Sequence, residues 1–331
     1  MELLCDAVFE GGGVKGIGLV GGVCGVESAG YSFRNVAGTS AGAIVASLLS
    51  VGYTGAEIKA EMLKLDFQKF RGEDWLTKLG LSGKMAKLIL KSGVYNADYL
   101  ESWLNELFKR KGKTRFGDIR EPDAPKGQSR YKFQAIASDL SGSRMLILPG
   151  DLTLFGIDPD KFSITRAVRM SMSIPLFYEP FILTDADGRK HVIVDGGLLS
   201  NYPMWLLDSN KPNPPCPTFG FKFCADKSKE PETEDYTAAD KLPGLLKALV
   251  RTGMDAHDNH YISVSKGDYK RTIPISSVIA RNGKQAPVNA VDFAIRREDQ
   301  EALFNNGLTA AKTFIRAWSF DNWKSTYRSG V

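Results

Sequence analysis

The N-terminal part of the chain alternates twice between a short apolar run, a glycine-rich turn and a longer apolar stretch. Residues 3–9 and 33–37 have the apolar composition of buried strands, and each run leads into glycines. Residues 16–29 and 41–51 follow with the small and apolar side chains of buried helices. Such alternation is typical of α/β proteins with a mostly parallel sheet, so we expect both turns at the same sheet edge.

The rest of the chain adds further elements to this pattern. We expect strands near residues 131–137, 144–148, 191–194 and 218–223, and helices near residues 242–262 and 298–320. Residues 55–115 show helical periodicity with no convincing strand, and predict a helical cap inserted into the α/β core. We find no internal repeat and expect a single domain over residues 1–331, with a less characterised C-terminal part over residues 206–331.

Composition excludes several classes of protein. The 331 residues are 43% hydrophobic and 24% charged, which is ordinary globular usage and not that of a disordered or fibrous chain. The net charge of +5 suits an anionic surface but does not indicate nucleic acid. The four cysteines lack metal-ligand spacing and suggest a reducing compartment. We expect a cytoplasmic or peripheral membrane protein, with delivery into another cell left open.

The cap contains one basic amphipathic stretch, residues 75–97. It contains no acidic residue, and its four lysines are interspersed with apolar side chains. The lysines are Lys78, Lys84, Lys87 and Lys91. A helix of this kind can lie in a membrane interface, or it can pack its apolar face on the protein and solvate the other. Both interpretations remain open.

The second glycine turn, residues 38–42, has the pattern Gly-x-Ser-x-Gly. A serine in that position, between a strand and a helix, is typical of the nucleophile elbow of hydrolases. The helix dipole and free amides there favour developing negative charge. The alternative is an ordinary small-residue helix start, since the pattern is short. The sequence therefore makes Ser40 a candidate nucleophile.

The first glycine turn, residues 11–16, has two interpretations. Gly-x-Gly-x-x-Gly after a strand can bind a dinucleotide, but that site needs an acidic residue at the end of the second strand, and residues 34–38 contain none. The other interpretation is an oxyanion hole, in which consecutive glycines expose backbone N–H groups. Lys15 would add positive charge nearby.

A nucleophilic serine needs a base, and the chain has only three histidines. His191 precedes a strand, while His257 and His260 lie three apart in an expected helix with no hydrolase signature around them. A carboxylate is the other option. Asp195 follows an apolar strand and precedes two glycines, which suits either a catalytic carboxylate or an Asp-Gly turn.

Taken together, these motifs resemble the patatin-like phospholipase family. The glycine turn 11–16, the elbow 38–42, the block 167–180 and Asp195-Gly196-Gly197 with Asn201 and Pro203 stand in the family's order. The similarity covers residues 5–205. It implies a three-layer α/β/α fold with a mostly parallel central sheet and a Ser–Asp dyad without histidine. The implied roles are nucleophile (Ser40), base (Asp195), oxyanion hole (Gly11, Gly12, Gly13) and support (Lys15, Gly38, Gly42, Gly196, Gly197).

The resemblance also implies a function. It is lipid acyl hydrolysis of the phospholipase A or lysophospholipase type, without metal or organic cofactor, on a phospholipid or lysophospholipid reached by transient membrane contact. An acyltransferase with the same dyad and a non-catalytic lipid-binding protein are the alternatives, and a protein activator is undecided. Arg166 and Arg169 could hold phosphate or form ordinary salt bridges. Because an unperturbed aspartate is a weak base, we expect burial to raise the pKa of Asp195.

Overall fold

A computed structural model describes residues 3–66, 69, 93–95, 97–121, 130–209, 211, 213–224, 267–281 and 283–328. Its centre is an eight-stranded sheet with the order β10-β9-β1-β2-β4-β8-β7, in which β5 also pairs with β4. The neighbours from β10 to β4 are parallel, whereas β8, β7 and β5 join by antiparallel pairing. The strands are β1 (Leu3–Phe9), β2 (Tyr31–Gly38), β4 (Phe133–Asp139), β5 (Arg144–Leu148), β7 (Phe181–Thr184), β8 (Lys190–Asp195), β9 (Thr218–Cys224) and β10 (Thr272–Ser276).

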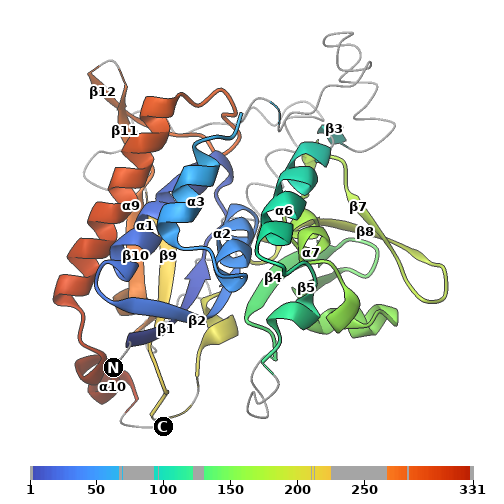
Figure 1. Ribbon diagram of the computed structural model, residues 1–331, viewed down its shortest axis with the longest axis horizontal. Coiled ribbons are helices and arrows are strands. Elements are labelled where there is room, and N and C mark those ends of the chain that lie inside the picture. The colour runs from blue at the N-terminus through green and yellow to red at the C-terminus, as the bar shows by residue number, and fades with distance from the viewer. Residues whose placement is uncertain are drawn as a thin grey trace.

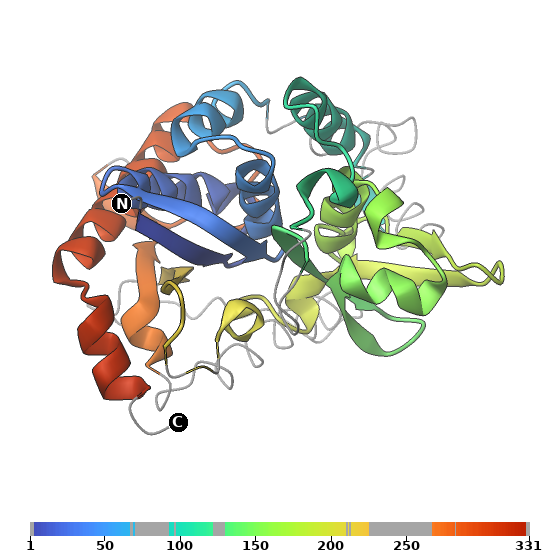
Figure 2. The same cartoon turned by 60° about the horizontal axis from the view of Figure 1, so that its bottom comes forward.

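Helices flank this sheet, most of them on one face (Figures 1 and 2). They are α1 (Gly16–Glu27), α2 (Ala41–Ser50), α3 (Gly55–Met62), α6 (Asp98–Arg110), α7 (Ile164–Ser171), α9 (Arg297–Ala317) and α10 (Phe320–Tyr327). The main core lies under this helix layer and includes Ala7 and Phe9 of β1, while Val8 belongs to a smaller cluster with Tyr202 and Met204. Successive strand residues point to opposite faces, so both faces of β1 are buried.

The expected α/β architecture is confirmed. All six predicted strands are present, and α1 and α2 occupy the predicted helices to within two residues of their ends. The expected helix at residues 298–320 is α9, which ends at Ala317 and is followed by α10. The expected helix at residues 242–262 lies outside the described residues.

The expectation of no convincing strand within residues 55–115 is wrong at one point. β3 (Gly93–Tyr95) is a strand, which pairs with β6 (Leu176–Tyr178) in a small separate sheet. A three-residue strand leaves no periodicity to detect, and only its distant partner stabilises it. The described helices of this range, α3 and α6, lie in the same layer as α1 and α2 (Figure 1). The four lysines of the amphipathic stretch lie outside the described residues.

Helices α1 and α9 pack with their backbones in contact. A Cβ atom on Gly307 of α9 would lie 1.9 Å from the carbonyl oxygen of Gly18, and one on Gly21 would lie 1.9 Å from that of Phe304. Glycine at these positions is what allows so close an approach. The two remaining short strands, β11 (Val278–Arg281) and β12 (Lys284–Pro287), form a hairpin ahead of α9. Among the described residues, no helix is both long and apolar enough to cross a membrane.

The antiparallel strand β8 has a specific consequence for the site. Gly38 at the end of β2 pairs with Ala135 of β4, whereas Asp195 at the end of β8 pairs with Ala137. Strand β4 therefore extends past β2, and β8 runs back along this extension until it ends near the level of the elbow. The two turns that follow β1 and β2 lie at the same sheet edge, as expected for parallel neighbours.

Candidate active site

Ser40 lies in a strained turn between β2 and α2. Its φ of 53° and ψ of −123° fall in a region that non-glycine residues rarely adopt. Its backbone N–H donates to Ser171 Oγ at 3.0 Å. Small residues let the turn pack tightly: a Cβ on Gly42 would lie 2.2 Å from the Phe9 carbonyl oxygen, and one on Gly38 would lie 2.4 Å from the carbonyl carbon of Gly42. A strained serine between a strand and a helix is the backbone arrangement that a nucleophile elbow requires.

Asp195 lies at the end of β8 with 1% of its surface exposed. Its backbone N–H donates to the Ser173 carbonyl at 2.9 Å, and its Oδ1 accepts from the Gly197 N–H at 2.7 Å. Gly196 packs against β4, where a Cβ would lie 2.2 Å from the Ile136 carbonyl oxygen. The two oxygens of the carboxyl group therefore differ, because one is held by the turn that follows the strand.

The pKa of Asp195 is raised to about 7, mainly because burial disfavours the charged form. Hydrogen bonding from the Ser40 side chain and from the Gly197 N–H opposes this rise. The contact with Ser40 is a loose one, since Oδ2 is buried and has no partner in strict hydrogen-bond geometry among the described residues. The expected rise in the pKa of Asp195 is confirmed. Among the described residues, no hydrogen-bond donor occupies Oδ2 in strict geometry, so this oxygen is available to accept a proton.

The glycine loop after β1 passes beside Ser40. A Cβ on Gly11 would lie 3.2 Å from the Ser40 Cβ. The Gly11 N–H already donates to the Asn201 carbonyl at 3.0 Å, so of the three amides predicted for the oxyanion hole this one is used structurally. Within the described part of the chain, no residue accepts a hydrogen bond from Gly12 or Gly13. Gly13 has a φ of +55°, which glycine adopts without strain.

Lys15 ends the short turn that follows this loop. Its ammonium group sits 4.6 Å from the centre of the Phe223 ring, and its charge lowers the pKa of the neighbouring Glu10 carboxyl. Burial has the larger effect and raises that pKa overall. Glu10 is paired with Lys222 at 2.7 Å. The structure thus places Lys15 close to the Glu10–Lys222 ion pair and the Phe223 ring.

The structure excludes His191 as a partner of Ser40. Its Nδ1 lies 3.3 Å from Asp139 Oδ2, and its Nε2 lies 3.3 Å from Asp185 Oδ2. The ring packs edge-on against Phe155. Both nitrogens are therefore directed at carboxylates away from the elbow. His257 and His260 lie outside the described residues.

The end of α7 and the residues that follow it hold both members of the predicted dyad, although the sequence indicated no role for the serines there. Ser171 Oγ accepts the Ser40 N–H, and the Ser173 carbonyl accepts the Asp195 N–H. Arg169 is buried and donates to Ser173 Oγ and to the Glu179 carbonyl, so it positions this segment. The only available signal was the position of both serines within the block at residues 167–180.

Arg166 also has a structural environment. Its guanidinium lies 5.3 Å from the centre of the Phe162 ring and 5.2 Å from that of Phe181. These cation–π contacts stabilise the charged side chain, so its position does not require a phosphate ligand. Among the described residues, no cluster of histidine, cysteine and acidic side chains could hold a metal ion.

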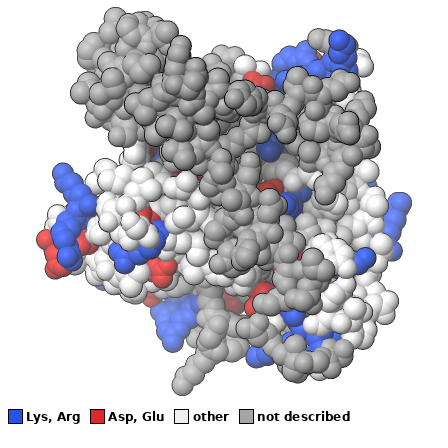
Figure 3. Space-filling model, turned by 180° about the vertical axis from the view of Figure 1, so that it is seen from behind, with Lys and Arg blue, Asp and Glu red and all other residues white. Residues whose placement is uncertain are grey.

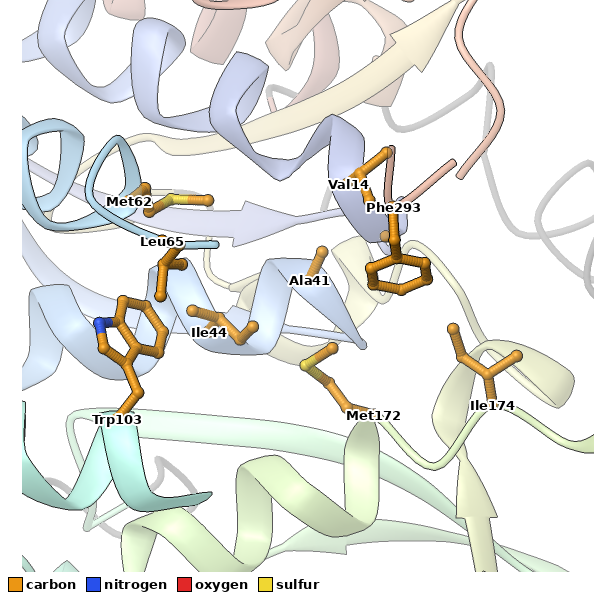
Figure 4. Close-up of a pocket in the computed structure, with 10 residues that line it drawn as sticks. Val14, Ala41, Ile44, Met62, Leu65, Trp103, Met172, Ile174 and Phe293 are labelled. Carbon is orange, nitrogen blue, oxygen red and sulfur yellow. The ribbon is translucent and has the colours of Figure 1, made fainter. Parts of the chain in front are cut away.

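An apolar pocket adjoins the elbow and the glycine loop (Figure 4). Its side chains come from α2, α6, the end of α3, the segment after α7 and the segment before α9. The sequence showed little chemical signal in the C-terminal third, yet Phe293 lines this pocket and the Ala290 carbonyl accepts from the Val14 N–H at 2.9 Å. The lining residues are Gly13, Val14, Ala41, Ile44, Met62, Leu65, Trp103, Met172, Ile174 and Phe293.

Comparison with known proteins agrees with this architecture. The family model described as patatin-like phospholipase matches residues 7–208. YqhO of Bacillus subtilis (strain 168), an uncharacterized protein, is 34% identical over 315 residues, which cover 95% of this chain and 99% of YqhO. The uncharacterized protein R571 of Acanthamoeba polyphaga mimivirus is 24% identical over 316 residues, which cover 94% of this chain and 93% of R571.

Two solved structures share the fold at low sequence identity. VipD from Legionella pneumophila superposes with a TM-score of 0.50 and 18% identity, covering 96% of this chain and 67% of VipD. The type III effector protein ExoU of Pseudomonas aeruginosa gives a TM-score of 0.50 and 15% identity over 94% of this chain and 52% of ExoU. With the match over residues 7–208 and the full-length similarity to YqhO, the chain belongs to the patatin-like phospholipase family.

Proposed function

We propose that this protein is a lipid acyl hydrolase of the phospholipase A or lysophospholipase type, with Ser40 as nucleophile and Asp195 as general base. One observation carries the proposal: a buried carboxyl with a pKa of about 7 and an unpartnered Oδ2 lies beside a serine in a strained strand-to-helix turn. A general base works best when its pKa is near the working pH. Family membership supports the lipid ester as substrate class.

The reaction would proceed through an acyl-enzyme. Asp195 Oδ2 takes the Ser40 hydroxyl proton while Oγ attacks the ester carbonyl carbon. The tetrahedral intermediate then expels the alcohol, which leaves with the proton held by Asp195. In the second half, Asp195 deprotonates a water molecule that attacks the acyl-serine, and the fatty acid leaves as Ser40 regains its proton. Each half uses the same carboxylate once as base and once as acid.

The amides of Gly12 and Gly13 are our candidates for the oxyanion hole. They belong to the loop that touches Ser40, and no described residue uses them, whereas the Gly11 N–H is bound to Asn201. Removing one such donor typically costs a factor of 10² to 10³ in kcat, so two amides would supply a large part of the acceleration. The N-terminus of α2 adds a favourable dipole at the same place.

The test is an assay on lipid vesicles. Purified protein is incubated with mixed phospholipid and lysophospholipid vesicles, and released fatty acid is quantified by mass spectrometry. We expect Ser40→Ala and Asp195→Asn each to lower kcat by at least about 10³-fold, since neither half of the reaction proceeds without its partner. An added alcohol acceptor distinguishes hydrolysis from acyl transfer, because a transferase would form the new ester in preference to free fatty acid.

Two matched controls test the dyad against the alternative bases. Asp185→Asn removes another largely buried carboxylate of the β7–β8 hairpin and should leave the rate unchanged, because the hydrogen bonds that the structure shows for this carboxylate stay within the hairpin, to Asp187, Arg189 and His191. A variant with all three histidines changed to glutamine should also remain active. Full activity of Asp195→Asn, or loss of activity in the histidine variant without loss of folding, would overturn the proposed dyad.

A further inference from the structure

The apolar pocket beside the elbow is elongated. Figure 4 shows Val14 and Phe293 toward one end, then Ala41, the residue after Ser40, and at the other end Met62, Leu65 and Trp103. Figure 4 shows Ile44 between these ends, on the same face of α2 as Ala41. Ala41 and Ile44 are three residues apart, which is a rise of about 4.5 Å along the helix. The lining thus follows α2 away from Ser40.

The chemistry of the lining suits one kind of occupant. Every side chain that lines the pocket is apolar, and Val14, Met62, Met172 and Phe293 are each at least nine-tenths buried. A head group or a phosphate would find no charged or polar side chain there, whereas a hydrocarbon chain would be removed from water on several sides. Because the near end adjoins Ser40, the chain that enters it belongs to the acyl group under attack.

Trp103 closes the far end of the pocket. It lies on α6, whose neighbouring residues Leu100 and Leu104 are buried in the core. Helix α6 is tied to α7 by a hydrogen bond from Thr165 Oγ1 to Asn105 Oδ1 of 2.7 Å. Figure 4 shows the indole nitrogen on the side of the ring away from Ile44, so the apolar part of the ring faces the pocket. A large side chain on an anchored helix limits the length of what lies in front of it.

We propose that the acyl chain runs from Ser40 along α2 and that Trp103 determines its preferred length. This inference rests on the proposed function. Chains that end before Trp103 are buried completely, and longer ones must leave their terminal methylenes outside the pocket. Trp103 touches the substrate in this arrangement but takes no part in the chemistry. It is therefore a specificity-determining residue, and its effect should appear in the ratio of rates between chain lengths.

The experiment measures kcat/KM for lysophosphatidylcholines and p-nitrophenyl esters with acyl chains from butyryl to stearoyl. Wild type is compared with Trp103→Ala, Trp103→Phe and the converse variant Ile44→Phe, which places bulk nearer to Ser40. We expect Trp103→Ala to raise the long-to-short ratio about tenfold, the effect of burying roughly two more methylenes, with Trp103→Phe intermediate and Ile44→Phe lowering it. The ratio is independent of the fraction of protein that is folded.

Trp318→Ala is the matched control, because Trp318 packs on Phe219 and Phe314 and does not line the pocket. Binding of the fatty acid series is measured in parallel on the Ser40→Ala background. Hydrolysis with the same chain-length profile in all variants would overturn the role of Trp103. Absence of hydrolysis in wild type, with fatty acid affinities that still shift with Trp103, would overturn the proposed function but support the acyl path. Neither hydrolysis nor fatty acid binding would overturn both.

Discussion

At the scale of single residues, the environment of Asp195 is the basis of the proposed chemistry. Oδ1 accepts a hydrogen bond from the Gly197 N–H. Oδ2 is buried, and no described residue forms a hydrogen bond of strict geometry with it. Burial therefore dominates, and the pKa rises to about 7 although the Gly197 N–H and the Ser40 side chain oppose the rise. A carboxyl group in this position is a far stronger base than an ordinary aspartate.

The activity should therefore depend on pH in the neutral range. The base must be deprotonated to accept the Ser40 proton, so log kcat/KM should rise by about one unit per pH unit below pH 7 and level off above it. The measurement is the initial rate of ester hydrolysis from pH 5 to 9, with circular dichroism to verify folding throughout. A flat profile above pH 5 would show that Asp195 keeps an ordinary pKa, or that another group limits the reaction.

Ser171 should matter for the elbow although it does not touch the substrate. In Ser171→Ala the buried Ser40 N–H loses its acceptor, which typically costs about 1–3 kcal/mol of unfolding free energy. Because this bond also restrains the strained backbone of Ser40, we expect kcat to fall about tenfold with little change in KM.

Ser47→Ala is the control for that prediction. Ser47 is equally buried, but its hydroxyl donates within α2 to the Ile44 carbonyl and does not reach the elbow. Denaturant unfolding and steady-state kinetics would be compared for the two variants. An equal loss of kcat in both would mean that Ser171 acts only through general stability.

At the scale of elements, the contact between α1 and α9 links the C-terminal part of the chain to the glycine loop. Gly307→Ala would place a methyl group 1.9 Å from the Gly18 carbonyl oxygen, so the helices would have to separate. We expect a loss of about 3 kcal/mol of unfolding free energy, at the upper end of the usual cost of overpacking. Activity should also fall, because the segment before α9 carries Ala290 and Phe293.

Thr309→Ala tests whether that effect is specific to the contact. Thr309 lies on the same helix but is exposed, and alanine is the better helix former, so its unfolding free energy should not decrease. Both variants would be compared by chemical denaturation and by hydrolysis at equal folded fraction. Unchanged stability of Gly307→Ala would show that α9 can shift without loss of packing.

At the scale of the whole molecule, the net charge of +5 bears on membrane contact. On the face opposite to that of Figure 1, basic and acidic side chains of the described residues are interspersed (Figure 3). We expect stronger sedimentation with anionic than with zwitterionic vesicles and a decrease with added salt. A quadruple lysine-to-serine variant at positions 78, 84, 87 and 91 should weaken binding by roughly 1 kcal/mol for each lysine that reaches the surface.

A matched variant removes the same charge from dispersed positions. It changes four exposed lysines on separate elements to serine (Lys161, Lys190, Lys284 and Lys312). If the basic amphipathic stretch contacts the membrane, this variant should bind almost as wild type does. Equal weakening in both variants would mean that net charge alone drives binding, and the stretch would then be a solvated face.

Much of this architecture could be predicted from local sequence. The two strand-turn-helix units, the elbow and the glycine loop depend on glycine conformation and on apolar periodicity over a few neighbouring residues. For that reason Ser40 and Gly13 were found at the positions where the structure has its turns. The strand that carries Asp195 was also predicted, but the sequence alone left Asp195 and the histidines as competing bases.

Only the tertiary structure distinguishes the two of those candidates that it describes, His191 and Asp195. His191 and Asp195 lie four residues apart on one strand, yet one faces two carboxylates and the other faces the elbow with a free oxygen. The same holds for the Gly11 amide bound to Asn201, for Arg169 beneath Ser173, and for Phe293 in the pocket. The burial, the pKa and the hydrogen bonds of a side chain depend on residues far away in the sequence. A local sequence pattern does not determine which of those residues the fold brings into contact with it.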